Sequence, residues 1–288
     1  MHSRWFSLAF LLLSAVNAKA VIGWSVNIDD PLNEYTSLHS AIEANFFAAS
    51  NAWGSHIVGS GTIDVNISFE NIGTADGGSV ATQFDHMSAD GRYVYQQGAA
   101  YEAITGIDPN GSASDINIRL GRDWMNNVLW WDPNPTLRTD AIPDFHVDGQ
   151  STLMHEIGHG LAFNGWRDGT TGALPGDYES PFDENVVAGG SYLWFSGPHA
   201  EAAYGGPVPL TLGNYGHYGN LGGPGNEFVG VGLMNGVYSY YQTRWNVSTI
   251  DLGILQDTGF TLVSSVPEPT TLAVVGLGVA AILRRRKR

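Results

Sequence analysis

The sequence contains no cysteine. Disulfide bonds are therefore excluded, and the fold must be stabilised by its hydrophobic core and by any metal that it binds. Zinc–thiolate sites and a cysteine nucleophile are excluded as well, so metal ligands would have to be histidine, aspartate or glutamate. The 288 residues include 9 Trp, 12 Tyr and 12 Phe, which supplies enough large side chains for a substantial core.

Lysine is also scarce and lies only near the two ends, as Lys19 and Lys287. The whole chain has 13 basic and 28 acidic residues. Seven of the basic residues and one acidic residue lie in the terminal segments 1–20 and 265–288. The body over 21–264 therefore has 6 basic and 27 acidic residues, a net charge of −21. So acidic a body repels phosphate backbones and anionic membranes, which excludes nucleic acid as a partner.

Residues 1–20 have the pattern of a secretory signal peptide. Arg4 precedes an apolar run over 5–16, and Ala18-Lys19-Ala20 provides the small residues of a cleavage site. A charged, an apolar and a small-residue region in this order are typical of signal peptides. We therefore predict export across the inner membrane, with the mature body beginning after the cleavage site.

The C-terminal segment 265–288 has three parts in a fixed order. Pro267-Glu268-Pro269 comes first, an apolar run over 270–283 follows, and the basic cluster 284–288 ends the chain. As a helix, the apolar run would span about 21 Å, against roughly 30 Å for a bilayer core, so it is short for a permanent anchor. Together the three parts resemble the PEP-CTERM sorting signal.

This resemblance implies transient inner-membrane anchoring and an exosortase-type processing enzyme as a partner at the C-terminal tail, in the envelope of certain Gram-negative bacteria. After removal of the tail, the protein would reside in the cell envelope, at the surface or outside the cell. The expected organisation is a signal peptide over 1–20, one domain over 21–264 and a sorting signal over 265–288.

Hydrophobic patterning within the body predicts an α+β domain. Apolar residues at helical spacing predict a helix over 32–53, and alternation of apolar and polar residues predicts strands over 62–69 and 115–120. The glycines of 73–78 predict a break after the first strand, and the prolines of 132–135 predict a turn.

The second half of the body is expected to be less regular. Segment 167–232 is rich in Gly, Pro, Tyr and Asn, which predicts loops. Segment 248–258 predicts a final helix, with Ser248 as its cap and Asp251 at the third position of a capping box.

The motif His155-Glu156-Ile157-Gly158-His159 lies in a helix predicted over 151–163, which ends at Asn164-Gly165. Helical residues four apart differ by about 40° in projection, so both imidazoles leave one face and can bind one ion. Glu156 lies about 60° from His159 and overhangs that face without pointing at the ion. The pattern predicts a Zn²⁺ site in which Glu156 is the general base for zinc-activated water.

A catalytic zinc has three protein ligands and an open coordination position, so a third ligand must come from elsewhere in the chain. The histidine candidates downstream are His199 and His217, and a carboxylate would suit a site with an acidic third ligand. His146, shortly before the helix, could support a ligand rather than bind the ion. The acidic candidates are Asp177, Glu179, Asp183 and Glu184.

Four features within residues 151–260 follow one another as in the leishmanolysin-like branch of the metzincins. They are His155-Glu156-x-x-His159-x-x-Ala162-Phe163, then His217, then Leu233-Met234-Asn235, then Leu252-x-x-Leu255-x-Asp257-x-Gly259-Phe260. The chain resembles this family and the bacterial metalloproteases that carry the same sorting tail. It departs from the family at Ala162, where the family has the glycine at which its chain turns sharply away.

The resemblance implies a zincin/metzincin-like α+β fold, with a mixed twisted sheet, an active-site helix and an irregular C-terminal subdomain. It also implies a secreted or surface zinc metalloendopeptidase that acts on protein or peptide substrates. By the same resemblance, His217 is the third zinc ligand, Met234 forms the hydrophobic floor beneath the zinc, and Tyr238 is a candidate stabiliser of the oxyanion. An extended substrate is expected to pair with an edge strand, for which 116–120 is the candidate.

Two alternatives stay open at this point. Proteins with this sorting tail are often linked with exopolysaccharide, so the body could be a non-catalytic extracellular matrix protein that binds glycan through its Tyr and Trp residues. Ca²⁺ is a second candidate cofactor for so acidic a chain. However, Asp108-Pro109-Asn110-Gly111 with Asp115 lacks the spacing of an EF-hand loop and is predicted to be a turn.

Overall fold

The computed structural model describes residues 22–237 and 240–263. The predicted signal peptide over 1–20, the sorting segment over 265–288 and Tyr238 lie outside the described residues. Among the described residues, no helix is long and apolar enough to cross a membrane.

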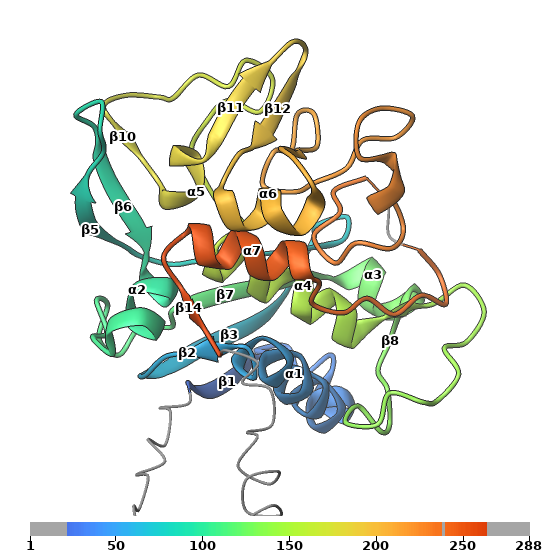
Figure 1. Ribbon diagram of the computed structural model, residues 1–288. Coiled ribbons are helices and arrows are strands. Elements are labelled where there is room, and N and C mark those ends of the chain that lie inside the picture. The colour runs from blue at the N-terminus through green and yellow to red at the C-terminus, as the bar shows by residue number, and fades with distance from the viewer. Residues whose placement is uncertain (1–21, 238–239, 264–288) are drawn as a thin grey trace, which may run out of the picture.

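A four-stranded sheet lies in the lower half of the molecule in Figure 1. Its order is β1-β3-β7-β4, where β1 is Gly23–Asp29, β3 is Thr62–Glu70, β7 is Ile116–Gly121 and β4 is Ala75–Ser79. The first three strands are parallel, and β4 runs antiparallel to β7. Alternate residues of β3 and β7 are buried, as the alternation in the sequence predicted for both strands.

The edge strand β4 was not predicted from the sequence. Its residues read Ala-Asp-Gly-Gly-Ser, and the glycines predicted a break rather than a strand. Instead β4 pairs with β7 over its whole length, with Ala75 opposite Leu120 and Ser79 opposite Ile116. Because β7 is then flanked by β3 and β4, the prediction that 116–120 forms a substrate-binding edge is wrong.

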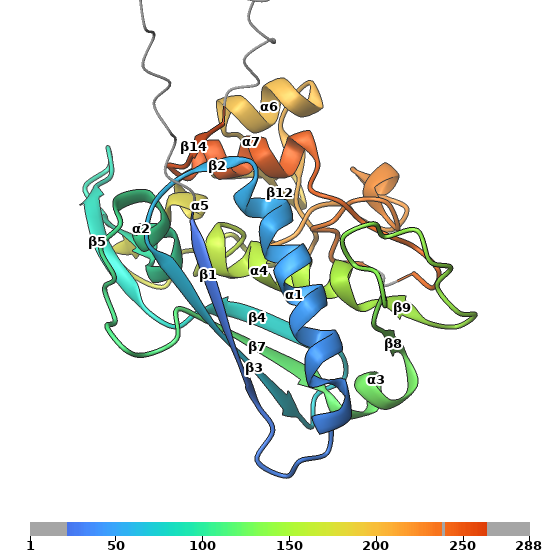
Figure 2. The same cartoon turned by 90° about the horizontal axis from the view of Figure 1, so that it is seen from below.

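Two long helices, α1 (His39–Gly54) and α4 (Gly149–Leu161), pack against each other and against the sheet. Figure 2 shows α1 crossing α4 in the view from below. The indole N–H of Trp53 in α1 donates a hydrogen bond of 2.8 Å to the carbonyl oxygen of Met154 in α4. Since both groups are buried, this bond fixes how the two helices lie relative to each other.

The start of α1 differs from the predicted start at residue 32. The carboxylate of Asp30 accepts hydrogen bonds from the backbone N–H groups of Glu34 and Tyr35, at 2.9 and 2.8 Å. This cap-like arrangement holds the segment in a turn, so the regular helix begins only at His39.

Short elements surround this core, and several of them lie in segment 167–232, where only loops were predicted. Ser248 and Asp251 form both halves of the predicted capping box at the start of α7. The remaining elements are β2 (Ile57–Val58), β5 (Thr82–Met87), β6 (Tyr93–Gln97), α2 (Gly98–Thr105), α3 (Arg122–Asn127), β8 (Leu129–Trp130), β9 (Val147–Asp148), β10 (Tyr178–Glu179), α5 (Pro181–Glu184), β11 (Val186–Gly189), β12 (Tyr192–Phe195), α6 (Pro198–Tyr204), β13 (Val208–Pro209), α7 (Thr249–Asp257), β14 (Thr261–Leu262) and the 3-10 helices η1 (Thr36–Leu38) and η2 (Asn226–Phe228).

Candidate metal centre

A buried network fixes the N-terminus of α4. Asp148 caps the helix by accepting a hydrogen bond of 3.1 Å from the backbone N–H of Ser151, and it forms an ion pair with Arg138. The guanidinium of Arg138 also donates to the hydroxyl oxygen of Ser151 at 2.7 Å. Because the cap is Asp148, the helix begins at Gly149, two residues before the predicted start.

Two glycines let α4 lie unusually close to its neighbours. A Cβ atom at Gly158 would lie 2.6 Å from the sulfur of Met234, and one at Gly160 would lie 2.5 Å from Cδ1 of Ile116 in β7. Both distances are shorter than real Cβ contacts, so a side chain at either position would force Met234 or Ile116 to shift from its place against the helix. Met234 is fully buried against the turn of helix that carries His159.

His217 is carried by a segment that is hydrogen-bonded to the segment of Met234. The backbone N–H of Tyr218 donates to the carbonyl oxygen of Met234 at 3.0 Å, and Tyr218 forms a parallel bridge with Asn235. A Cβ atom at Gly236 would lie 2.7 Å from Cβ of His217, so this glycine also permits a close approach. These contacts bring His217 over α4, although it follows His159 by 58 residues.

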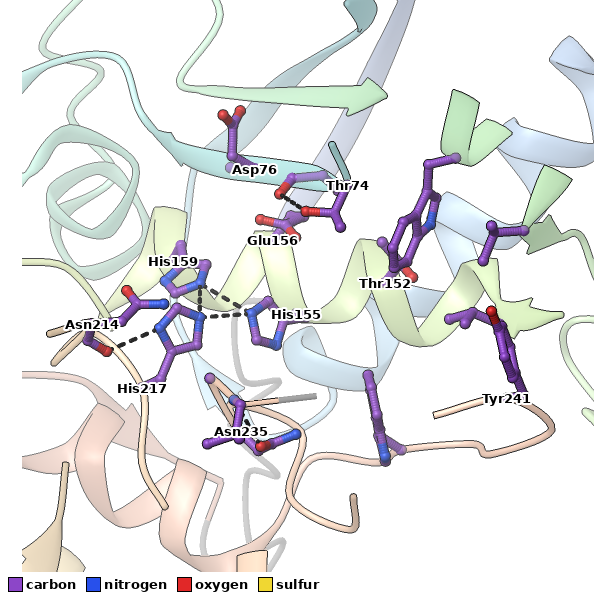
Figure 3. A pocket seen from close by; sticks show the side chains of 18 residues that line it. Thr74, Asp76, Thr152, His155, Glu156, His159, Asn214, His217, Asn235 and Tyr241 are labelled. Atoms are coloured by element: carbon purple, nitrogen blue, oxygen red, sulfur yellow. Dashed lines mark hydrogen bonds between the residues drawn. The ribbon is translucent and has the colours of Figure 1, made fainter. Parts of the chain in front are cut away.

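The Nε2 atoms of His155, His159 and His217 converge at one point (Figure 3). The distance is 3.1 Å between His155 and His159, and 3.0 Å from His217 to each of the other two. The first two rings leave one face of α4, as the helical spacing predicted. The third ring is that of His217, one of the two downstream histidines that the sequence offered as a further ligand.

The Nδ1 atom of each ring faces a backbone carbonyl oxygen, which can only accept a hydrogen bond. The pairs are His155 with Leu233 at 2.6 Å, His159 with Phe163 at 2.7 Å and His217 with Asn214 at 3.2 Å. Each neutral ring therefore carries its proton on Nδ1, and its Nε2 is left as a lone-pair acceptor. Three lone pairs then face one another with no proton between them, which is the arrangement that a bound cation satisfies.

Burial keeps these imidazoles neutral. Burial and the neighbouring His159 lower the pKa of His155 to about 3. Burial also lowers the pKa of His159, and burial together with the two other rings holds the pKa of His217 well below its usual value. Neutral imidazole is the form that binds a metal ion, so the site needs no deprotonation at pH 7.

Glu156 lies on α4 beside the two helical histidines and lines the same cleft. Glu156 is only 5% exposed. Burial is the main cause that raises the pKa of its carboxyl group to about 8, and the negative charge of Asp76 adds to the rise. A Cβ atom at Gly77 of β4 would lie 2.6 Å from Cβ of Glu156, so glycine is required for the edge strand to pass this close. A carboxyl group with a raised pKa beside three converging imidazoles is suited to proton transfer near neutral pH.

The histidines and Glu156 open onto a cleft of ≈ 600 Å³. Residues 74–77 of β4 and the turn before it form one wall, and Figure 3 shows Thr74 and Asp76 on the far side of Glu156 from the histidines. The other lining residues are mostly apolar or amide side chains: Trp124, Val128, Val147, Asn214, Asn235, Val237, Tyr241 and Trp245. The cleft thus offers both a strand edge and an apolar surface beside the three Nε2 atoms.

The other residues considered as ligands do not join this group. Among the residues that the structure describes, the histidine group contains His155, His159 and His217 alone. Asp177 is exposed just before β10. The partners of the others are Asp257 for His199, Arg167 for Glu179, Tyr215 for Asp183, His86 for Glu184 and the carbonyl oxygen of Asp144 for His146.

Behind His217, Tyr218 and Asp251 form a buried pair whose stability should depend on pH. The Tyr218 hydroxyl donates a hydrogen bond of 2.7 Å to Oδ1 of Asp251, and both residues are 0% exposed. Burial raises the pKa of Asp251 to about 6, and hydrogen bonds from Ser248 and Tyr218 oppose the rise. Because the unfolded chain releases this proton near pH 3.9, this carboxyl group should contribute about 3 kcal/mol of stability below that pH, and the contribution should be lost as pH rises through about 6.

Replacing Tyr218 with phenylalanine should extend this loss to higher pH. The variant leaves the Asp251 carboxylate with one donor fewer and raises its pKa further, which costs about 1–3 kcal/mol once the group is charged. Urea unfolding should therefore show a larger destabilisation at pH 7.5 than at pH 4.5. Tyr93→Phe, at an exposed strand position, is the control, and an equal loss at both pH values would contradict the role given to this pair.

A family model described as the PEP-CTERM protein-sorting motif matches residues 265–288. The chain carries a PEP-CTERM motif. The motif implies export, sorting to the envelope or surface, and processing by an exosortase at the C-terminal end, as the sequence predicted. No curated protein and no solved structure matches the chain. The PEP-CTERM motif thus accounts for the tail, and the residues of the cleft, which lie between 74 and 245, must be interpreted from their own chemistry.

Proposed function

We propose that this PEP-CTERM protein is an exported zinc-dependent endopeptidase. The observation that carries the proposal is the convergence of three histidine Nε2 atoms, 3.0–3.1 Å apart, beside Glu156 in an open cleft. Nitrogen lone pairs at this distance repel one another unless a cation lies among them. A glycan-binding matrix protein would have no need of this arrangement.

Zinc is the cation that fits this donor set best. Three neutral imidazoles with no thiolate are typical ligands of catalytic zinc, and three protein ligands leave a coordination position for water or substrate. Each Nδ1 donates to a backbone carbonyl, the outer contact that orients most metal-binding histidines. His155, His159 and His217 would therefore hold the ion, with Met234 as the apolar floor against α4.

The chain's own proton-transfer group is Glu156. When bound, zinc would lower the pKa of water to about 7 and polarise the substrate carbonyl. Glu156 accepts the proton of the attacking water and returns it to the leaving amine when the peptide bond breaks. Burial raises the pKa of Glu156 to about 8 in the absence of an ion. A bound zinc ion would act in the opposite direction and would favour the ionised carboxylate, the form that acts as a base at neutral pH.

The substrate would lie along β4. This strand is the edge of the sheet, and residues 74–77 line the cleft beside Glu156. An extended peptide can add to such an edge through main-chain hydrogen bonds, which holds a peptide bond next to the catalytic group. The apolar wall at Trp124, Val128 and Trp245 would receive a hydrophobic side chain of the substrate. This mode of binding supports endopeptidase activity on unfolded or extended segments.

The architecture supports the metzincin interpretation of the sequence. The sheet has three parallel strands and an antiparallel edge strand that lies beside the cleft. The helices α1 and α4 pack against each other and against this sheet. Met234 lies under the helix, and the segment that carries His217 is bonded to it. These are the relationships that the resemblance implies between the third ligand, the methionine and the active-site helix.

The decisive experiment combines metal analysis with hydrolysis of casein by the purified protein. We expect about one zinc per chain, loss of hydrolysis on treatment with 1,10-phenanthroline, and recovery when zinc is added back. A protein that contains zinc but hydrolyses neither casein nor short peptides would contradict the endopeptidase proposal. A protein that neither binds zinc nor hydrolyses casein would favour the non-catalytic matrix-binding alternative.

A further inference from the structure

A second cluster of oxygen ligands lies at the start of β7, apart from the histidines. Glu102 lies in α2, Asp108 in the loop that follows, and Asp115 directly before β7. One carboxylate oxygen from each of the three lies within 4.8 Å of the others. Glu102 is 5% exposed and Asp115 is 2% exposed, whereas Asp108 reaches the surface. Two buried carboxylates and an exposed one therefore face one another.

Among the residues that the structure describes, no basic side chain forms an ion pair with this cluster. The body between 21 and 264 has no lysine and six arginines. Every one of these arginines is paired with an acidic residue elsewhere. The pairs are Arg92 with Asp90, Arg119 with Asp76, Arg122 with Glu34, Arg138 with Asp148, Arg167 with Glu179 and Arg244 with Asp132. Buried carboxylates normally have a cation or a full set of hydrogen bonds, and no arginine of the body supplies positive charge to this cluster.

Two buried oxygen atoms at the cluster have no hydrogen-bond partner. They are Oδ1 of Asp115 and Oδ1 of Asn110. The second oxygen of Asp115 accepts a hydrogen bond of 2.7 Å from the backbone N–H of Asp64, which fixes the carboxylate and leaves Oδ1 open. The amide nitrogen of Asn110 donates to the carbonyl oxygen of Ala113 at 2.8 Å, which fixes the orientation of its oxygen. An unpartnered oxygen on the fixed, buried carboxylate of Asp115, with a second on the half-buried Asn110, indicates a missing ligand rather than a mobile surface group.

The electrostatics agree with this geometry. Burial, followed by the charges of Asp115 and Asp108, raises the pKa of Glu102, although the backbone N–H of Thr62 donates to it. Burial, with the charges of Asp108 and Asp64, also raises the pKa of Asp115. The carboxylates therefore repel one another in the ion-free protein, and a divalent cation would reverse that repulsion.

We propose that Glu102, Asp108 and Asp115 bind a calcium ion, with Oδ1 of Asn110 as a further ligand. The donors are all oxygen, which disfavours zinc and the other transition metals at this position. Calcium accepts six to eight oxygens in irregular geometry, whereas magnesium needs near-ideal octahedral geometry and keeps several waters. Export places the domain where calcium is abundant, and extracellular calcium modules bind with Kd values of about 10⁻⁴–10⁻³ M.

The ion would join three strands of the sheet that supports α4. The backbone N–H of Asp115 donates to the carbonyl oxygen of Asp64 in β3, and the carbonyl oxygen of Asp115 accepts from Val80, which follows β4. The next residue, Ile116, is the one against which Gly160 of α4 packs. Calcium would therefore stabilise the sheet under the candidate metal centre without contacting the histidines.

The test is thermal unfolding of the purified, zinc-loaded protein with 0–10 mM CaCl₂ or MgCl₂. If Kd is about 0.1 mM, the highest calcium concentration should raise Tm by roughly 5–10 °C, and magnesium should raise it far less. Titration calorimetry should give about one calcium per chain. The absence of a shift with calcium, or an equal shift with magnesium, would overturn the proposal.

Asp115→Asn separates ion binding from an ordinary structural role. Without calcium, this variant should be at least as stable as the wild type, because it removes a buried repulsion and keeps an oxygen to accept from Asp64. With calcium, it should lose the shift, as should Glu102→Gln, while Asp29→Asn at an exposed position should keep it. If Asp115→Asn is destabilised equally with and without calcium, the residue is structural and the assignment fails. His217→Ala should keep the calcium shift, which shows that the two metal sites are independent.

Discussion

Replacing Glu156 with glutamine should lower kcat/KM for peptide hydrolysis by roughly 10²- to 10⁴-fold and leave about one zinc bound per chain. Glutamine keeps the size and the polar head of the side chain but cannot take a proton from water. In the proposed site the three histidines hold the zinc, so the metal should remain. Hydrolysis of a quenched fluorescent peptide and metal analysis of the same preparation measure both expectations.

The fold should tolerate this change. Glu156 has no ion-pair partner among the described residues, and a buried carboxyl group with a raised pKa is already easily neutralised. Glu43→Gln, at an exposed position of α1, is the matched control and should retain full activity. If Glu156→Gln lost its zinc together with its activity, the residue would support the metal rather than transfer protons. Undiminished hydrolysis would exclude it from the reaction altogether.

Replacing His217 with alanine should remove both zinc and hydrolysis. The loss of an outer partner of a metal-binding histidine alone costs about 10- to 100-fold in affinity, so the loss of a ligand should cost more than about 100-fold. Competition with a chromogenic zinc chelator measures the affinity directly. The variant should also fold, because Tyr218 and Met234 keep the backbone hydrogen bond that positions this segment.

His199→Ala is the informative control for this experiment. His199 was the other downstream histidine considered from the sequence, and its imidazole contacts Asp257 at 2.7 Å rather than the α4 histidines. Its removal should leave zinc affinity unchanged. The opposite pattern, with zinc lost in His199→Ala and kept in His217→Ala, would require a different third ligand and a rearranged C-terminal subdomain.

The parts of the site that depend on local spacing were predictable from the sequence. Helical periodicity alone placed His155 and His159 on one face, with Glu156 beside them. The capping box at Ser248 was predictable for the same reason, because both of its residues lie within one turn. In contrast, no local pattern links His217 to a helix 58 residues earlier. The residues alone offered it as one of two downstream histidines, and the resemblance to a family favoured it over His199.

What the sequence could not predict depends on contacts between distant segments. Strand β4 contains two glycines and no β-branched residue, so its propensity opposes a strand. It forms because β7 supplies a hydrogen-bonding edge and because Gly77 permits close packing on Glu156. The oxygen cluster was predicted as a simple turn for a related reason. Glu102 is brought to Asp115 by the packing of α2 on β3 rather than by loop spacing.

The absence of lysine and the ion pairs of the arginines in the body affect how easily other proteases can cleave this protein. Proteases of the trypsin type cleave only after lysine or arginine and need that side chain extended into their own binding pocket. Between residues 21 and 264, such a protease would find six arginines, each held by a carboxylate of the folded domain. The buried ion pairs of Arg138, Arg167 and Arg244 therefore also withhold three of these cleavage sites, and a protease of that specificity would have to unfold the domain before cutting there.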